Sequence, residues 1–242
     1  LDEAGEMGEF PPRAMTAEET YMEGHGVFKA TSSAIYNSTY PPYKAFDKEI
    51  PYNTSTNQWV SQGGSYDNAS PQSFPVTSGD KAVLFEGTYG SWIQLQMPYK
   101  IFLKKMVSFI RLNRDHEHAT SGIIYGSNDG GNTYERVYTF NDVPVSDLLY
   151  QGVHHEINPT KAYSTYTFQI TKLEGQRSFT PIGELKFFGT RERGQSTLHD
   201  GSLTLTKNLT VPRIGPALDA DDTPRRDRLV VEYNTSTNPT AN

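Results

Sequence analysis

The sequence contains no cysteine and no long apolar run. The 242 residues therefore hold no disulfide, no thiolate nucleophile and no cysteine-ligated zinc site. A membrane-spanning helix needs roughly 18 or more consecutive apolar residues, and no stretch comes near that length, so we expect no membrane span. Only 35% of the residues are hydrophobic and helical patterns are scarce, whereas 15 Tyr and 12 Phe residues favour strands.

Basic residues are also in short supply. Lys and Arg number 22 against 28 Asp and Glu, which gives a formal net charge of −6. Binding to nucleic-acid phosphates depends on basic side chains, so this balance argues against a nucleic-acid partner. A Ser-His-Asp order, a zinc signature, a phosphate loop and paired carboxylates are absent from the sequence as well, and we expect no catalytic activity.

The composition changes towards both ends of the chain. Residues 1–9 carry four acidic residues and no basic one, which indicates a solvated acidic lead-in. Residues 191–242 are too short and too polar for a core of their own and end in an Asn/Thr/Ser-rich stretch typical of linkers. We interpret 10–190 as one folded domain and 191–242 as an extended β-arm or linker that contacts neighbouring copies or subunits.

Alternating apolar and polar residues predict strands between these ends. Successive side chains of a strand point to opposite faces, so alternation marks a strand with one buried face. Turn-forming clusters at 127–132 and 158–160 separate the candidates, and short strands with regular turns indicate an antiparallel all-β sandwich or barrel. The candidate strands are 91–97, 105–111, 122–126, 134–140, 163–171, 182–188, 202–206, 209–214 and 229–233.

Several short motifs then occur in a recognisable order. They are Ala45-Phe46-Asp47, Asn57-Gln58-Trp59, Ser91-Trp92-Ile93-Gln94-Leu95, Ile124-Tyr125-Gly126-Ser127 and Ile182-Gly183-Glu184-Leu185. Over residues 10–190 this order resembles discoidin domains, also called coagulation factor V/VIII type C domains, which include the family 32 carbohydrate-binding modules. The variant is similar to that in surface proteins of large algal viruses and marine protists. The resemblance implies an eight-stranded antiparallel jelly-roll sandwich of the galactose-binding-like fold, with a ligand site on loops at one end.

The resemblance also implies a structural calcium site. Hard cations prefer several oxygen ligands at once, and discoidin-like modules often hold calcium between the loop after Ala-Phe-Asp and the last strand. The implied ligands here are the backbone oxygens of Lys44 and Gly183, the carboxylates of Asp47 and Glu184, and the amide of Asn53 or Asn57. The alternative is that Asp47 caps a turn and Glu184 pairs with a lysine.

Three loops of such modules recognise sugars. A sugar site needs an aromatic ring for the apolar face of the sugar and planar polar groups for its hydroxyl pairs. Galactose-binding relatives often place a histidine just after the loop tryptophan, where this sequence has Val60, which argues against galactose specificity. A charged loop set with no ligand is the alternative. The candidate sugar-binding residues are Gln62, Tyr66, Arg111, Arg114, His116, His118, Arg177 and Phe179.

Two further motifs have a structural interpretation. His116 and His118 would face one side of a strand and could share a metal ion, but no third ligand has a compatible spacing, and a solvated loop is the favoured interpretation. Residues 127–134 resemble the Asp-box hairpin of sialidases, whose Asp and Ser side chains bind the amides of their own turn. We expect no sialidase activity from this hairpin.

Five Asn-x-Ser/Thr sequons are candidate N-glycosylation sites and favour an extracellular or virion-surface location. The sequence thus predicts a non-catalytic carbohydrate-binding or adhesion module whose partners are glycans. The alternative is a structural building block of a fibre, filament or capsid without a sugar ligand. Phospholipid binding is less well supported, because it needs exposed apolar and basic residues at loop tips and the loop 53–75 is polar. The sequons lie at Asn37, Asn53, Asn68, Asn208 and Asn234.

Overall fold

Antiparallel strands make up most of the described part of the chain. The computed structural model describes residues 6–51, 56–67, 72–110, 117–144 and 152–192, and the backbone of 197–199 and 202–204, all within the first of two units, Leu1–Asn208 and Leu209–Asn242. Within these ranges η1 (Pro42–Phe46) is a short 3-10 turn, and no helix could cross a membrane. The strands are β1 (Met7–Phe10), β2 (Glu19–Met22), β3 (Gly26–Ser32), β4 (Trp59–Val60), β5 (Leu84–Phe85), β6 (Thr88–Tyr89), β7 (Trp92–Phe109), β8 (Ala119–Ser127), β9 (Glu135–Phe140), β10 (Val153–Glu156), β11 (Tyr163–Leu173), β12 (Pro181–Ile182), β13 (Glu184–Arg191), β14 (Thr197–His199) and β15 (Ser202–Thr204).

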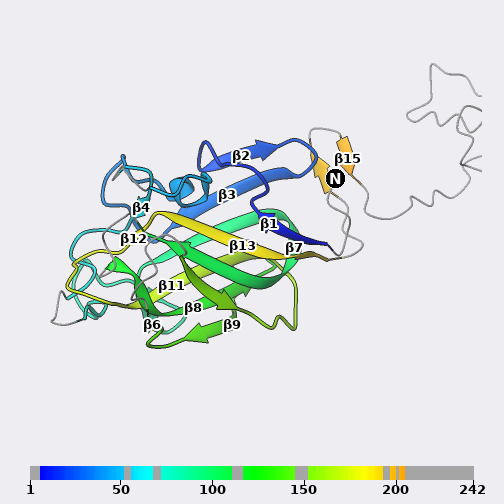
Figure 1. Ribbon diagram of the computed structural model, residues 1–242. Helices are drawn as coiled ribbons and strands as arrows, with labels where there is room; N and C mark the ends of the chain where they lie inside the picture. The colour runs from blue at the N-terminus through cyan, green and yellow to red at the C-terminus, as the bar shows by residue number, and fades with distance from the viewer. Residues whose placement is uncertain are drawn as a thin grey trace, which may run out of the picture. The chain divides into compact units, whose positions relative to one another are not determined.

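Strand β7 takes part in both layers of a sandwich. Its first half pairs with β3 and β11, and its second half pairs with β13 and β10. From β11 the ladder continues to β8 and β9, and from β13 it continues to β1, always antiparallel (Figure 1). The predicted antiparallel all-β jelly-roll sandwich is therefore confirmed.

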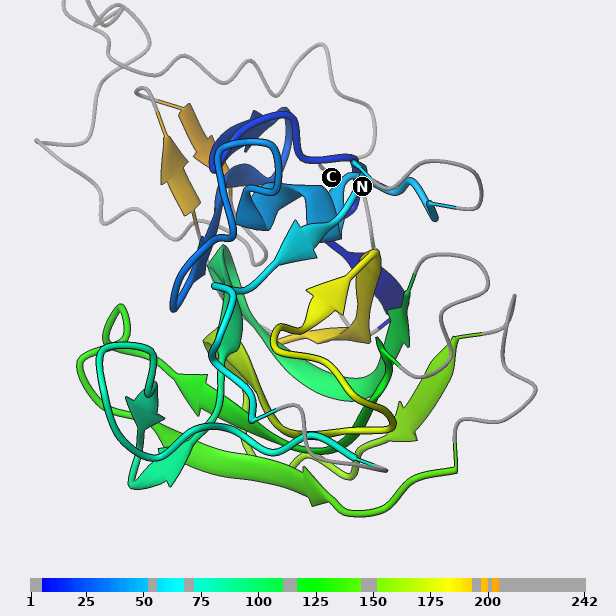
Figure 2. The ribbon, with the colours of Figure 1, turned by 90° about the vertical axis from the view of Figure 1, so that its left-hand side faces the viewer.

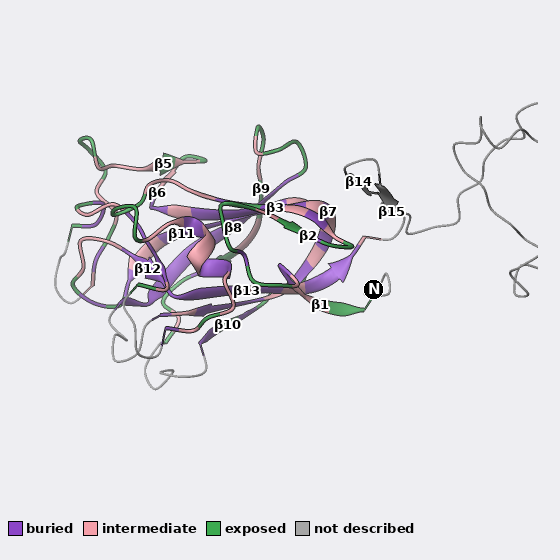
Figure 3. Ribbon diagram, turned by 90° about the horizontal axis from the view of Figure 1, so that it is seen from above, coloured by how far each residue is buried: buried purple, intermediate pink, exposed green. Residues whose placement is uncertain are grey.

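The side-chain pattern of β7 explains how one strand serves two layers. Alternate residues from Ile93 to Leu103 are buried, and a bulge near Lys104 then shifts the phase, so that Met106 faces the core. We predicted two strands here, at 91–97 and 105–111. They form one strand of 18 residues, because the intervening residues alternate as well. Figure 3 shows the buried strands inside a shell of exposed turns.

The ends of the sandwich differ from the predicted boundaries. Residues Met7–Phe10 form β1, which pairs with β13. Residues 7–9 of the predicted acidic lead-in 1–9 therefore belong to the sheet. At the other end, residues 202–204 pair with 197–199. Residues 205–242 lie outside the described residues, and the contact of 191–242 with neighbouring copies stays a prediction.

The Asp-box hairpin has the predicted structural role. The Asp129 carboxylate accepts hydrogen bonds from the backbone N–H groups of Asn132 and Thr133, both at 3.0 Å, and from the Ser127 hydroxyl at 2.8 Å. The Thr133 hydroxyl also donates to this carboxylate and has the largest effect. Together these bonds hold the pKa of Asp129 well below its usual range. Gly130 and Gly131 supply the positive φ angles of the turn, 74° and 92°.

Candidate sugar-binding and cation sites

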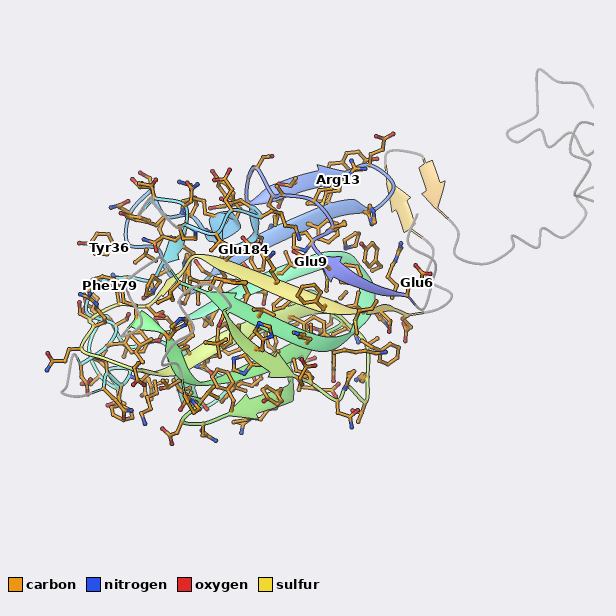
Figure 4. The ribbon with its side chains drawn as sticks, viewed as in Figure 1. Glu6, Glu9, Arg13, Tyr36, Phe179 and Glu184 are labelled. Carbon is orange, nitrogen blue, oxygen red and sulfur yellow. The ribbon has the colours of Figure 1, made fainter. Side chains whose placement is uncertain are left out.

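An aromatic hollow opens at one end of the sandwich. It has a volume of about 180 Å³. Figure 2 looks onto this end, where the short cyan strand β4 lies beside the yellow strand β12. Figure 4 shows two of its residues, Tyr36 and Phe179, close together at this end and Glu6 towards the opposite one. Three of the five lining residues are aromatic and none is charged: Tyr36, Tyr40, Gln58, Val60 and Phe179.

One short segment of backbone holds both aromatic loops. The N–H of Tyr36 donates to the carbonyl of Val60 at 2.8 Å. The N–H of Ser61 donates to the carbonyl of Thr180 at 2.9 Å, and the Ser61 hydroxyl accepts the N–H of Thr180 at 2.9 Å. Because Thr180 follows Phe179 directly, residues 60–61 fix the loop that carries Tyr36 and the loop that carries Phe179 relative to each other.

The rings meet at angles that leave a concave apolar surface. The centroids of Tyr36 and Phe179 are 5.8 Å apart with an interplanar angle of 60°, and those of Tyr36 and Tyr40 are 6.2 Å apart at 74°. Tyr36 is 54% exposed, so part of its ring is available for contact. Gln58 also lines the hollow but is only 2% exposed. Apolar rings next to two phenols are groups that bind the faces and hydroxyls of a sugar.

The predicted sugar-binding residues do not all gather at this hollow. Phe179 lines it. Gln62 and Arg177 are partly exposed but lie outside its walls. Three more candidates, Arg111, Arg114 and His116, lie outside the described residues.

Two of the predicted sugar-binding residues are core residues instead. Tyr66 is 2% exposed and its hydroxyl donates to the carbonyl of Ile170 at 2.9 Å, so its ring offers no face to a ligand. His118 is also 2% exposed, and burial lowers its pKa to about 4, which keeps the imidazole neutral at pH 7. The favoured interpretation of 116–118 as a solvated loop is therefore wrong for Glu117 and His118.

Glu117 has a structural partner in the loop before Phe179. Its carboxylate is fully buried, and its Oε1 lies 3.1 Å from Nε of Arg177. The N–H of Arg177 also donates to the Ser73 hydroxyl at 2.8 Å. A buried carboxylate that keeps a charged partner is costly to disrupt. Arg177 therefore anchors the loop that carries Phe179.

Sequence reasoning did not identify Tyr36, Tyr40 or Gln58. The site loops were chosen by resemblance, and the loop 33–41 was not among them. A usable signal was present, because two tyrosines flank three small polar residues in Tyr36-Asn37-Ser38-Thr39-Tyr40. A loop of this kind has no core of its own, so its rings are covered only where a neighbouring loop packs against them.

The two predicted calcium carboxylates lie close enough to affect each other. Glu184 is 1% exposed, and its Oε2 accepts the N–H of Lys48 at 3.1 Å. Burial is the main cause that raises the pKa of Glu184 to about 9, and the charge of Asp47 adds to it. Burial likewise raises the pKa of Asp47 to about 6, although its Oδ1 accepts the N–H of Glu49 at 2.9 Å.

Two of the other predicted cation ligands, Gly183 and Lys44, belong to the described residues. Gly183 lies under the loop that follows Asp47, because a Cβ on it would come within 2.7 Å of Cγ of Pro51. The Lys44 ammonium donates to the carbonyls of Thr39 and Thr56 at 3.0 and 2.9 Å, which fixes its backbone near Asp47.

The Asn57 side chain has a carboxylate partner. Its amide nitrogen donates to the Glu49 carboxylate. Asn53 lies outside the described residues. Across the described ranges, no three His, Asp or Glu side chains are placed to share a metal ion.

Of the five predicted glycosylation sequons, the structure describes one. Asn37 is exposed at the rim of the hollow, one residue after Tyr36, and its Oδ1 accepts the N–H of Thr39 at 2.8 Å. The other four, at Asn53, Asn68, Asn208 and Asn234, lie outside the described residues.

Comparison with known proteins finds structural similarity only. The chain matches no protein-family model and no curated protein. Among solved structures it is similar to the Clostridium perfringens module CBM32-5 in complex with GalNAc-β-1,3-galactose (17% identity, TM-score 0.46, 67% of this chain and 95% of that one). It is also similar to the family 32 carbohydrate-binding module of C. perfringens NanJ in complex with galactose (13% identity, TM-score 0.44, 66% of this chain and 93% of that one). A third similar structure is CBM32-3 from a family 31 glycoside hydrolase of C. perfringens (18% identity, TM-score 0.48, 67% of this chain and 91% of that one). At these values no residue role carries over from those modules to this chain.

The raised pKa of Glu184 predicts that the metal-free protein loses stability as pH rises. The folded state keeps a proton up to about pH 9 that the unfolded chain releases above its ordinary pKa of 4.5. The free energy of unfolding should therefore fall between these values, by at most about 1.4 kcal/mol per pH unit for one proton. Urea denaturation in EDTA from pH 5 to 9 measures this slope.

Glu184→Gln should remove the contribution of Glu184 to the pH dependence of the free energy of unfolding, because glutamine keeps the shape of the side chain and stays neutral. The matched control is Glu156→Gln on the exposed face of β10, which should leave the slope as it is. Equal slopes for the wild type and Glu184→Gln would show that Glu184 ionises at its ordinary pKa in the folded protein.

Proposed function

We propose that the chain is a non-catalytic carbohydrate-binding module whose sugar site is the aromatic hollow. The observation that carries this proposal is the convergence of Tyr36, Tyr40 and Phe179 from two loops that the same backbone segment holds. A hollow of about 180 Å³ is smaller than the roughly 300 Å³ or more of a drug-sized pocket, which suits one sugar unit at the end of a glycan.

The chemistry of the walls favours an uncharged sugar. Among the described residues, no Lys, Arg, His, Asp or Glu lines the hollow, so they offer no partner there to a carboxylate or sulfate group. The rings offer apolar contact, while the phenols can exchange hydrogen bonds with hydroxyl or acetamido groups. Recognition of this kind gives modest affinity for a single sugar.

Loss of one ring should weaken sugar binding without unfolding the domain. Phe179→Ala and Tyr36→Ala should each reduce affinity by up to about tenfold, in line with roughly 0.5–1.5 kcal/mol for an aromatic ring contact. A glycan array identifies a ligand for the wild type, and calorimetry with that ligand measures each variant. The matched control is Tyr21→Ala, because Tyr21 is 53% exposed and lies on β2, away from the hollow. A wild type that binds no glycan, with or without calcium, would refute the proposal.

We further propose that a structural Ca²⁺ binds between Asp47 and Glu184. Support comes from the buried carboxylate of Glu184 and the nearby, partly buried carboxylate of Asp47, whose pKa values are both raised, since a divalent cation would offset their desolvation and repulsion. The backbone oxygens of Lys44 and Gly183 are the further candidate ligands. Binding would tie the loop after Asp47 to the start of β13.

Calcium should raise the melting temperature and displace protons. Because Glu184 is protonated at pH 7 in the metal-free state, binding should release close to one proton per ion and strengthen as pH rises. Differential scanning fluorimetry with Ca²⁺ or EDTA, and calorimetry in buffers of different ionisation enthalpy, measure both effects. Glu184→Gln should lose the calcium-dependent shift, and Glu156→Gln should keep it. A wild type with the same melting temperature in Ca²⁺ and EDTA would argue against this site.

An extracellular or virion-surface location fits the same proposal. The exposed sequon at Asn37 is accessible to a glycosylating enzyme. Expression through a eukaryotic secretory pathway should add a glycan there, and Asn37→Gln should lower the intact mass by one glycan. An unchanged mass would show that Asn37 is not modified and would remove the structural support for this location.

A further inference from the structure

A second groove lies on the outer face of the sheet, away from the aromatic hollow. It has a volume of about 370 Å³, roughly twice that of the hollow, and shares no residue with it. Strands β10, β7, β13 and β1 lie side by side and form its floor. The outer face of a sandwich is usually polar. Here the floor is apolar, with Val107, Phe109, Phe188 and the 57% exposed Met7.

Cationic side chains stand on this apolar floor in register. Residues paired across antiparallel strands point to the same face. His154 pairs with Val107, which pairs on its other side with Lys186, and one row along Lys105 pairs with Phe188. The ammonium group of Lys186 lies 5.7 Å from the centroid of the Phe109 ring. The groove thus places two ammonium groups and an imidazole beside two aromatic rings.

The acidic neighbours of these lysines are weakly held. Nζ of Lys105 lies 3.3 Å from Oε1 of Glu156, whose side chain is 75% exposed. Nζ of Lys186 lies 3.9 Å from Oε1 of Glu9, a carboxylate that also pairs with Lys48. Exposed ion pairs contribute little free energy. An anionic ligand can therefore replace Glu156 beside Lys105, and it can share Lys186 with Glu9.

We propose that this groove binds an anionic polysaccharide, one whose sugar units carry carboxylate or sulfate groups. The apolar floor matches the faces of the sugar rings, and Lys105 and Lys186 match their acidic substituents. A chain with a net charge of −6 attracts a polyanion only through such a local cationic site. This site is separate from the hollow, which has no charged wall.

The groove fits a slender chain better than two other anionic partners. A peptide that adds to a sheet pairs along an edge strand, whereas Lys105 and Lys186 stand on the inner strands β7 and β13, each of which is paired on both sides. A membrane surface needs protruding side chains. The side chains of Lys105 and Lys186 are only 30% and 23% exposed, so they are recessed.

Affinity electrophoresis of the full chain in gels that contain a polymer tests the proposal. Polygalacturonate supplies carboxylates, dextran sulfate supplies sulfates, and dextran is the uncharged control polymer. At low salt the wild type should be retarded by one or both polyanions and not by dextran, and added NaCl should reverse the retardation. The two polyanions distinguish a carboxylated from a sulfated ligand.

Variants connect the retardation to the groove. The double variant Lys105→Gln, Lys186→Gln should lose at least tenfold in affinity, whereas Glu156→Gln should gain affinity. Lys104→Gln removes one positive charge at an exposed neighbour outside the groove and should retain most binding. Phe179→Ala should leave polyanion binding intact, so the test does not depend on the function of the hollow.

Three outcomes would overturn the proposal. The first is no retardation by either polyanion. The second is equal loss of affinity in Lys104→Gln and in the double variant, which would indicate nonspecific attraction. The third is a wild-type dimer in sedimentation analysis that the double variant dissociates, which would make the groove an interface between copies of this chain.

Discussion

The packing of β7 in two layers at once is the constraint on which the rest of the fold depends. A strand that pairs with β3 and β11 over its first half and with β13 and β10 over its second must bury one face throughout. Regular alternation alone would expose Met106, and the bulge beside Lys104 prevents this by shifting the phase by one residue. The same shift turns Lys105, Val107 and Phe109 outwards, where they form the floor of the cationic groove.

The two proposed ligand sites follow from different parts of this architecture. The hollow is made of loops, and its rings are positioned by hydrogen bonds to residues 60–61. The groove is made of strands, and the sheet register places its side chains. One is uncharged and the other is cationic, so the same small domain can contact two chemically different regions of a complex glycan. Two weak sites on one ligand can together give firm attachment.

The sequence predicts the fold better than it predicts the site, for physical reasons. Alternation in 91–97 and 163–171 reports burial directly, and these strands form as expected. Whether a loop residue points inwards depends on distant contacts, so Tyr66 and His118 could not be recognised as core residues. The place of Tyr36 in the hollow depends on the hydrogen bond between its N–H and the carbonyl of Val60. Local sequence does not encode such a contact. Resemblance did place Asp47 near Glu184, but the raised pKa values come from burial that only the folded chain shows.

The short segment at residues 60–61 has a consequence for the energetics of binding. Loops that are free before binding lose conformational entropy when they close on a ligand, at roughly 0.5–1.5 kcal/mol for each side chain that becomes ordered. Here the loops that carry Tyr36 and Phe179 are already joined through Val60, Ser61 and Thr180. The aromatic walls are thus preorganised, and little of the contact energy with a sugar is lost in ordering the protein.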